Sequence, residues 1–305
     1  DKILLDRIHR IKTKQLSKYE KIQIVKNYML PEIVKSVGFQ INDILLSEKT
    51  LLYLIETFTN EAGVRKLKEH LFEIIRDLNL QYLLGTLTEF PIVITESMIE
   101  TIFLNKHKIK LKKIAKQPQI GIINGLYATS SGLGGITIIQ CTRCLSDQKL
   151  QLELTGHQGN IMKESMSVAK TVAWNLLSDT QQKKIEKKNS FGIHIHCPEA
   201  ATPKDGPSAG AAITVAIYSF LSQRKINNLY GITGEIDLNG KLLAIGGLAL
   251  KIDGAKKAGV QYVICPLENK EDVKKIRNEP NSPEDDKFHI IMIDTITEVL
   301  DLMLL

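Results

Sequence analysis

The segment Pro203-Lys204-Asp205-Gly206-Pro207-Ser208-Ala209-Gly210 places a serine between a Gly-Pro turn and a run of small residues. Gly206 and Pro207 favour a tight turn, and Ala209 to Ala212 begin a helix with almost no side-chain bulk. Amides at the N-terminus of a helix, together with its partial positive charge, suit an oxyanion that develops beside Ser208. Serine is also a preferred N-cap residue, so a plain capping role is the alternative.

A nucleophilic serine needs a base, and Lys251, in an otherwise apolar segment, is the candidate. A lysine acts as a base only when neutral, and with an unperturbed pKa near 10.4 only about 0.1% of it is neutral near pH 7.4. Burial that lowers this pKa by about 3 units costs about 4 kcal/mol, which proteins can supply. Ile245, Leu248 and Ile252 offer apolar cover. The alternative is a lysine that snorkels to the helix surface.

A Ser-His-Asp arrangement is a second way to activate the serine. His194 and His196 alternate on an expected strand and therefore face the same side, with Asp205 further along the chain. His196 lies just before Pro198, at the end of that strand, where it can order the loop by hydrogen bonding. We therefore favour a supporting role for His196 over a catalytic one.

The composition is that of a folded globular protein with room for two domains. Of the 305 residues, 43% are hydrophobic and 24% charged, as in globular rather than disordered chains. No apolar run approaches the ~18 residues of a membrane span, so no membrane partner is expected. The net charge of +6 allows weak DNA binding. The residues flanking the lone Cys141–Cys144 pair indicate a strand, in which positions three apart face opposite ways, so neither zinc nor redox chemistry is expected there.

The first part of the chain, residues 1–105, is predicted to be helical. From Glu61 to Leu78 the apolar residues recur with the spacing of one helix face, and Leu45 to Phe58 has a similar pattern. Ser97 and Glu100 have the spacing of a capping box at the start of a further short helix. This pattern predicts a small helical domain.

The second part, residues 119–305, is predicted to be an α/β domain. Between the two parts lies a basic stretch, residues 106–118, which we interpret as a solvated linker; a DNA-contacting strip is the alternative. In the second part strands and helices alternate. The expected strands cover 121–127, 136–143, 150–155, 191–197, 230–238, 262–266 and 288–293. The expected helices cover 159–177, 208–222, 248–258 and 295–304, with a turn at 130–135 and a basic loop at 183–188.

Several segments together point to one known family. They are Pro203 to Gly210, Thr233-Gly234-Glu235, Ile245-Gly246-Gly247-Leu248 and Lys251, supported by Thr155-Gly156, Met162-Lys163-Glu164-Ser165 and Glu268-Asn269-Lys270. With these residues the chain resembles the Lon family of ATP-dependent proteases, in particular the Lon A subfamily. The resemblance covers nearly the whole chain. It implies a small all-helical AAA+ lid subdomain followed by an α/β Lon-type proteolytic domain.

The resemblance also implies a role for each site residue. Ser208 becomes the nucleophile and Lys251 the general base of a catalytic dyad, and Thr233 matches the threonine that orients the lysine. His196 and Asp205 match residues that support the site. Peptide hydrolysis would then pass through an acyl-enzyme and need no metal or other cofactor.

The front of the chain fits the same family. Residues 1–10 resemble the end of the large ATPase subdomain, with Arg7 at the arginine-finger position, and Arg65 matches the nucleotide-sensing arginine of the sensor-2 motif. A surface salt bridge is the alternative for each arginine. Walker A and Walker B motifs are absent from this sequence. We therefore interpret the chain as a fragment of a longer protein that uses ATP and Mg²⁺.

The function implied is that of an ATP-dependent serine endopeptidase of protein quality control, acting on misfolded, damaged or regulatory polypeptides as a homo-oligomer, in full length a hexamer. A catalytically silent binding or assembly module for nucleic acid or protein is the alternative, and a Ser-His hydrolase of small esters a third. Gln140 and Ala200 depart from the family pattern, which bears on the resting conformation of the site and on its substrate preference. The Ile-, Lys- and Asn-rich composition favours the mitochondrial matrix, with a bacterial cytoplasm as the alternative.

Overall fold

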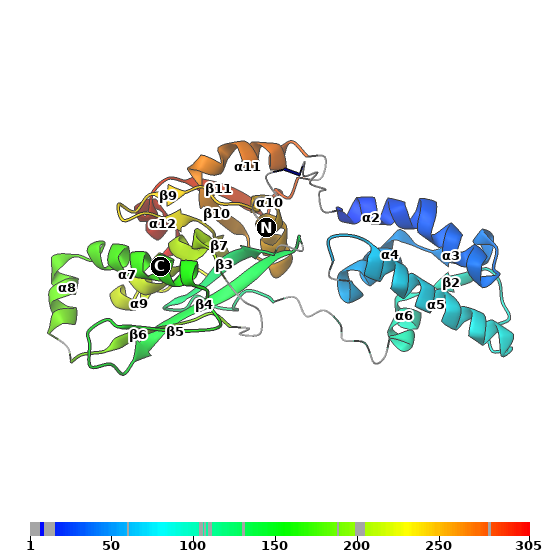
Figure 1. Ribbon diagram of the computed structural model, residues 1–305, viewed down its shortest axis with the longest axis horizontal. Coiled ribbons are helices and arrows are strands. Elements are labelled where there is room, and N and C mark those ends of the chain that lie inside the picture. Colours follow the sequence, from blue (N-terminus) through cyan, green and yellow to red (C-terminus); the bar gives the residue numbers. More distant parts are fainter. Residues whose placement is uncertain are drawn as a thin grey trace. The chain divides into compact units, whose positions relative to one another are not determined.

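The computed structural model describes residues 7–8, 16–59, 61–103, 106, 108, 112–129, 132–187, 189–198, 205–279 and 282–305. Ala200 therefore lies outside the described residues. The chain forms two compact units, residues 1–110 and 111–305 (Figure 1). Within the second unit, Ile114 N donates to Ala258 O at 3.2 Å and Asn228 Nδ2 donates to Ala115 O at 2.7 Å. The C-terminal part of the expected linker thus packs on the second unit.

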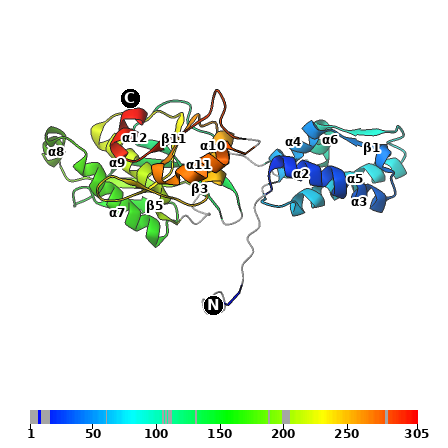
Figure 2. The ribbon, with the colours of Figure 1, turned by 90° about the horizontal axis from the view of Figure 1, so that it is seen from above.

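The first unit is a helical bundle (Figure 2). Its helices are α2 (Lys18–Ile24), η1 (Val25–Met29), α3 (Leu30–Val37), η2 (Ile41–Asp43), α4 (Glu48–Phe58), α5 (Arg65–Leu83) and α6 (Glu96–Ile102). The segments α2, η1 and α3 follow one another without a break, and the π-helical η1 comes just before Pro31. Proline has no N–H to donate, so a regular α-helical ladder cannot continue through it.

The core of the first unit forms largely as the sequence predicts. Helix α5 buries Leu67, Leu71, Ile74, Ile75 and Leu78, the apolar face that the spacing indicates. Two short strands, β1 (Ile44–Leu46) and β2 (Ile92–Ile94), pair in parallel beside the helices. The sequence does not predict them, because three residues are too few to show an alternating pattern.

The start of α6 differs from the prediction. Its N-cap is Thr95, whose Oγ1 accepts from Met98 N at 3.2 Å. The expected capping box of Ser97 and Glu100 is therefore wrong, since both residues already lie inside the helix.

The second unit is built on a seven-stranded sheet with the order β11-β10-β7-β3-β4-β6-β5. The strands are β3 (Ile122–Ala128), β4 (Gly134–Cys144), β5 (Leu152–Thr155), β6 (Gly192–His196), β7 (Tyr230–Ile232), β10 (Tyr262–Pro266) and β11 (His289–Ile293). β4 runs antiparallel to β3 and β6, and the other neighbours are parallel. A separate antiparallel pair is formed by β8 (Glu235–Ile236) and β9 (Leu242–Leu243).

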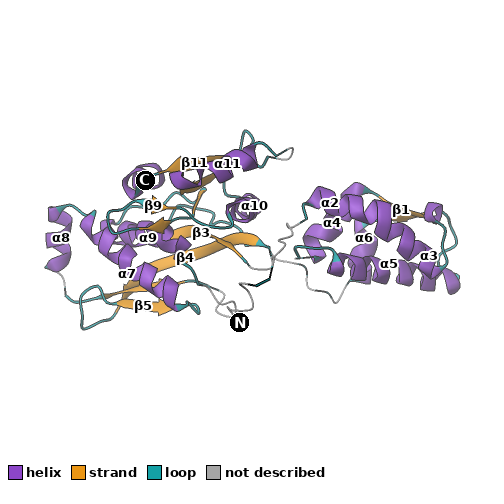
Figure 3. Ribbon diagram, turned by 45° about the horizontal axis from the view of Figure 1, so that its top comes forward, coloured by secondary structure: helices purple, strands orange, loops and turns teal. Residues whose placement is uncertain are grey.

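Helices cover both faces of this sheet (Figure 3). One face packs against α7 (Asn160–Asn175), α9 (Gly210–Ser222) and α12 (Ile296–Met303), the other against α10 (Leu248–Ala258) and α11 (Lys270–Arg277). Strand β10 shows the alternation: Ile264 joins the core of α9, while Val263 and Cys265 join the core of α10. The α/β architecture thus places α9 and α10 on opposite faces.

Several elements of the second unit differ from the prediction, among them α11 and β9, which the sequence pattern does not predict. The expected basic loop at 183–188 is in large part a helix, α8 (Asp179–Glu186), which Ser178 and Gln181 cap reciprocally. The expected strand 230–238 is divided into β7 and β8, with Thr233 and Gly234 between them. Among the described residues, no helix is both long and apolar enough to span a bilayer.

Candidate active site

Ser208 lies in a single 3₁₀ turn, η3 (Pro207–Ala209), that leads directly into α9. Its backbone is fixed by Gly234: Gly234 N donates to Ser208 O at 2.9 Å, and Ala211 N donates to Gly234 O at 3.0 Å. The N-cap of α9 is Ala209, without a side-chain cap. The capping alternative for Ser208 is therefore wrong.

The hydroxyl of Ser208 faces the side chain of Lys251, which comes from the first turn of α10. Lys251 Nζ lies 2.9 Å from Ser208 Oγ and 3.0 Å from Thr233 Oγ1. Lys251 is only 3% exposed, so the snorkelling alternative is wrong. Burial lowers the pKa of the Lys251 amino group from 10.5 to about 8. About a tenth of the lysine is therefore neutral at pH 7, against less than 0.1% for an unshifted lysine.

Thr233 sets the direction of the lysine's hydrogen bonds. It is fully buried, and its Oγ1 donates to Ser208 O at 3.3 Å. A hydroxyl has one proton, so Thr233 Oγ1 must accept from Lys251. When neutral, Lys251 donates one N–H to Thr233 Oγ1 and can direct its lone pair toward Ser208 Oγ, as a general base requires.

Two glycines allow α10 to lie close against β4. A Cβ built on Gly134 would lie 1.8 Å from Leu250 O, and one on Gly254 would lie 2.2 Å from Gly135 N. Only glycine fits such contacts between backbones. The sequence interpretation of 130–135 as a turn does not predict this close packing of α10 on β4. The signal available in the sequence is Gly254, an isolated glycine inside a predicted helix, which indicates a close approach of another segment.

Asp205 anchors the serine loop to the N-terminus of α7. Its Oδ1 accepts from Met162 N and from Gly206 N, each at 3.0 Å. A Cβ on Gly159 would lie 2.3 Å from Asp205 Cγ, so the carboxylate needs glycine there. A carboxylate is also favoured at a helix N-terminus. The structure thus gives Asp205 a place in the support of the loop.

His196 is bound to a threonine rather than to the serine. Its Nδ1 lies 2.7 Å from Thr155 Oγ1, and His194 Nε2 lies 2.8 Å from the same oxygen. Gln140 of β4 is paired directly across from His196. Because Ser208 Oγ is hydrogen-bonded to Lys251 Nζ, the geometry favours the lysine over the histidine as the base for Ser208.

Gln158, the residue before Gly159, is a buried polar side chain that the sequence does not single out. It is 7% exposed, and its buried Oε1 has no hydrogen-bond partner. Its Nε2 donates to Thr155 O at 2.6 Å, a carbonyl that also accepts from Cys197 N at 3.0 Å. An unpaired buried acceptor is costly to the fold.

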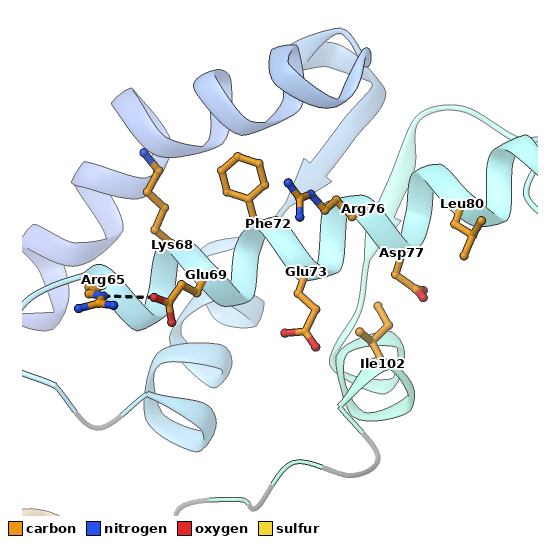
Figure 4. Close-up of a pocket in the computed structure, with 9 residues that line it drawn as sticks. All are labelled: Arg65, Lys68, Glu69, Phe72, Glu73, Arg76, Asp77, Leu80 and Ile102. Carbon is orange, nitrogen blue, oxygen red and sulfur yellow. Dashed lines mark hydrogen bonds and ion pairs between the residues drawn. The ribbon is translucent and has the colours of Figure 1, made fainter.

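The two predicted nucleotide-sensing arginines belong to the first unit. Arg7 is exposed, and most of its neighbours in sequence lie outside the described residues. Arg65 begins α5, and its 90% exposed side chain is paired with Glu69 at 3.2 Å. It lines a cavity of about 760 Å³ along α5, together with Phe72 and Arg76 (Figure 4). Their roles toward nucleotide stay predictions.

In the described part of the chain, no group of at least three His, Cys, Asp or Glu side chains is arranged to hold a metal ion. In the isolated CxxC pair, Cys141 is buried, and burial raises the pKa of its thiol to about 12. This thiol therefore stays protonated at neutral pH.

Comparison with known proteins identifies both units. Residues 93–305 match the family model of the Lon protease (S16) C-terminal proteolytic domain, and residues 35–102 match that of the Lon protease AAA+ ATPase lid domain. The chain is 34% identical to a Lon protease homolog of Acanthamoeba polyphaga mimivirus, over 98% of this chain and 35% of the relative.

Bacterial relatives show the same coverage. Identity is 36% to the Lon protease of Campylobacter jejuni, over 98% of this chain and 38% of the relative. Identity is also 36% to the Lon protease of Clostridioides difficile, over 99% of this chain and 37% of the relative. The chain thus spans little more than a third of the length of these relatives. It belongs to the Lon protease family and comprises a lid domain and a serine-protease domain of that family.

Proposed function

We propose that this chain is the lid and proteolytic part of an ATP-dependent endopeptidase that cleaves polypeptides with a Ser208–Lys251 dyad. One observation carries the proposal: a buried lysine with a lowered pKa lies 2.9 Å from the hydroxyl of a serine at the start of a helix. A nucleophile within hydrogen-bond distance of a base that a third group orients is the arrangement that acyl transfer requires.

The reaction follows from these contacts. Ser208 Oγ attacks the peptide carbonyl carbon while its proton passes to neutral Lys251 Nζ. The protonated Lys251 then gives this proton to the leaving amine as the C–N bond breaks, which leaves an ester on Ser208. In the second half, Lys251 takes a proton from water and the hydroxide oxygen attacks the ester carbonyl carbon. The bond between that carbon and Ser208 Oγ then breaks, the carboxylic acid product leaves, and the proton returns from Lys251 to Ser208 Oγ.

Labelling with a fluorophosphonate probe tests the proposal directly. The 305-residue chain should be labelled at Ser208, and Ser208→Ala and Lys251→Ala should abolish both labelling and peptide cleavage without loss of the fold. Because the pKa of Lys251 is about 8, the labelling rate should rise about tenfold from pH 7 to pH 9. Retained cleavage by purified Lys251→Ala would contradict the mechanism.

A silent nucleic-acid module receives less support from the contacts of the basic stretch. Lys106 is ion-paired with Glu73, and Lys108 with Glu100. Paired lysines present less net positive charge to phosphates. A chain that binds DNA and resists the serine probe would nevertheless establish this alternative over the enzyme.

For the whole protein, we propose that ATP drives the delivery of misfolded, damaged or regulatory polypeptides to this site in a homo-oligomeric ring. Membership in the Lon family supports this proposal, because an AAA+ ATPase lid domain matches in the same chain as the proteolytic domain. Arg65, whose side chain is 90% exposed at the start of α5, is the residue we expect to meet nucleotide phosphates. Its replacement by alanine should lower ATP-dependent cleavage of a folded substrate and spare cleavage of a short peptide.

A further inference from the structure

Asn269 forms hydrogen bonds with the backbone of a loop that is distant in sequence. It ends the 3₁₀ turn η4 (Leu267–Asn269) before α11 and is 3% exposed. Its Oδ1 accepts from Ile245 N at 3.0 Å, and its Nδ2 donates to Ile245 O at 2.9 Å. The amide thus pairs with both backbone groups of one residue, as a neighbouring strand would.

Asp272 and Glu268 each add a hydrogen bond that supports this contact. Asp272 Oδ2 accepts from Asn269 Nδ2 at 2.9 Å, which fixes the orientation of the amide group. Glu268 Oε2 accepts from Ala244 N at 3.0 Å, one residue before Ile245. Side chains from η4 and α11 therefore hold the loop 244–247, which joins β9 to α10.

The position of Lys251 depends on this loop. α10 begins after Gly247, whose φ is +70° and which offers no side-chain cap. Lys251 N donates to Gly247 O at 3.2 Å, so the lysine belongs to the first turn of the helix. A shift of the loop therefore moves Lys251 Cα directly.

The loop also contributes Ile245 to an apolar cluster beside the lysine. Ile245 is 9% exposed and joins one buried cluster with Leu248 and Ile252, the residues that flank Lys251 on α10. Release of the Ile245 backbone would loosen this cluster and admit water beside Lys251. Hydration favours the charged form of a lysine.

We propose that Asn269 is a positioning residue for the general base: by holding the backbone of Ile245, it keeps Lys251 Nζ dry and within hydrogen-bond distance of Ser208 Oγ. The proposal rests on the function proposed above for Lys251. It assigns Asn269 no contact with substrate. Its action is on the position and the protonation of the lysine.

The test is the pH dependence of Ser208 labelling by a fluorophosphonate in the full 305-residue chain. Asn269→Ala should move the midpoint of the labelling rate upward from about pH 8. If the midpoint rises by about one pH unit, the rate at a lower pH falls about tenfold, because the neutral fraction of the lysine falls by that factor. Asn269→Asp, which keeps the shape and the acceptor for Ile245 N but loses the donor, should move the midpoint in the same direction.

Asn124→Ala is the matched control. Asn124 is a buried asparagine, 4% exposed, whose Nδ2 donates to Asn228 O at 2.9 Å and to Tyr230 O at 2.8 Å. This variant also loses a buried amide that binds backbone, but not at the loop before Lys251. Its labelling midpoint should stay that of the unaltered chain.

Three results would overturn the inference. An unchanged midpoint in both Asn269 variants, with only a smaller labelled fraction, would make Asn269 a structural residue. Unfolding of both variants in circular dichroism would assign it to stability alone. Absence of Ser208 labelling in the unaltered chain would refute the proposed function itself. The role of Asn269 would then fail as well, because Lys251 would not act as a base.

Discussion

Replacement of Lys251 by methionine should reveal how much stability the fold gives up to keep this amine buried. The pKa of Lys251 falls from 10.5 in the unfolded chain to about 8 in the folded one, because burial disfavours the charged form. Converted by linkage, this difference is a destabilisation of about 3 kcal/mol at neutral pH. Methionine fills a similar volume and carries no charge.

The sign of the pH dependence follows from the two pKa values. At pH 7, about one unit below the folded pKa, Lys251 is mostly protonated in both states, so nearly the full cost of burying its charge is present. Above pH 10.5 it is neutral in both states, and the cost is absent. The unfolded chain binds the extra proton between these values, so the contribution of Lys251 to stability rises with pH across this window.

Methionine also removes the hydrogen bonds to Ser208 and Thr233, each worth about 1 kcal/mol. At pH 7 these losses offset most of the gain, and Lys251→Met should be about 1 kcal/mol more stable than the unaltered chain. At pH 10 the gain has fallen by about 2.5 kcal/mol, and the variant should be the less stable protein. The difference between the two pH values does not depend on the energy assigned to the hydrogen bonds.

Urea denaturation at pH 7 and pH 10 measures this difference. Trp174 is the single tryptophan and lies on α7, so its fluorescence reports on the proteolytic unit. Other lysines and tyrosines titrate in both proteins and cancel in the comparison. If Lys251→Met changes the free energy of unfolding equally at the two pH values, the buried amine has an ordinary pKa in the folded chain, and the base mechanism loses its physical basis.

Three further changes test other contacts of the site. Thr233→Val removes the acceptor that orients Lys251 and should lower peptide turnover about 100-fold while the circular dichroism spectrum stays unchanged; turnover near that of the unaltered chain would show that the lysine needs no orientation. Gly254→Ala places a methyl 2.2 Å from the backbone of β4 and should lower the free energy of unfolding in urea by about 3 kcal/mol or more. Gly246→Ala should be tolerated, because a Cβ built on Gly246 has no neighbouring atom within 4 Å. Equal effects of the two substitutions would contradict the close packing of α10 on β4. Gln158→Leu removes a buried acceptor without a partner and should raise the free energy of unfolding by about 1 kcal/mol, an expectation that a lower urea midpoint would overturn.

Features that depend on neighbours in sequence could be predicted from the sequence. Helix α10 runs from Leu248 to Ala258 and strand β10 from Tyr262 to Pro266, with the predicted limits, because apolar periodicity and the flanking glycines mark both. The turn before Ser208 is equally local. By contrast, the sequence pattern favours a loop over the helix α8, because this segment is polar and its capping box is a weak signal beside four lysines.

The chain by itself determined which side chains are available for the chemistry: one serine after a Gly-Pro turn and one lysine in an apolar segment. Only the tertiary structure decided that they meet, because Ser208 lies in η3, which leads into α9, and Lys251 lies on α10, and these two helices pack on opposite faces of one sheet. It also decided the protonation of the lysine. The apolar residues near Lys251 in sequence predict some cover, but a lysine that is only 3% exposed and has a lowered pKa also requires segments distant in sequence to pack over it.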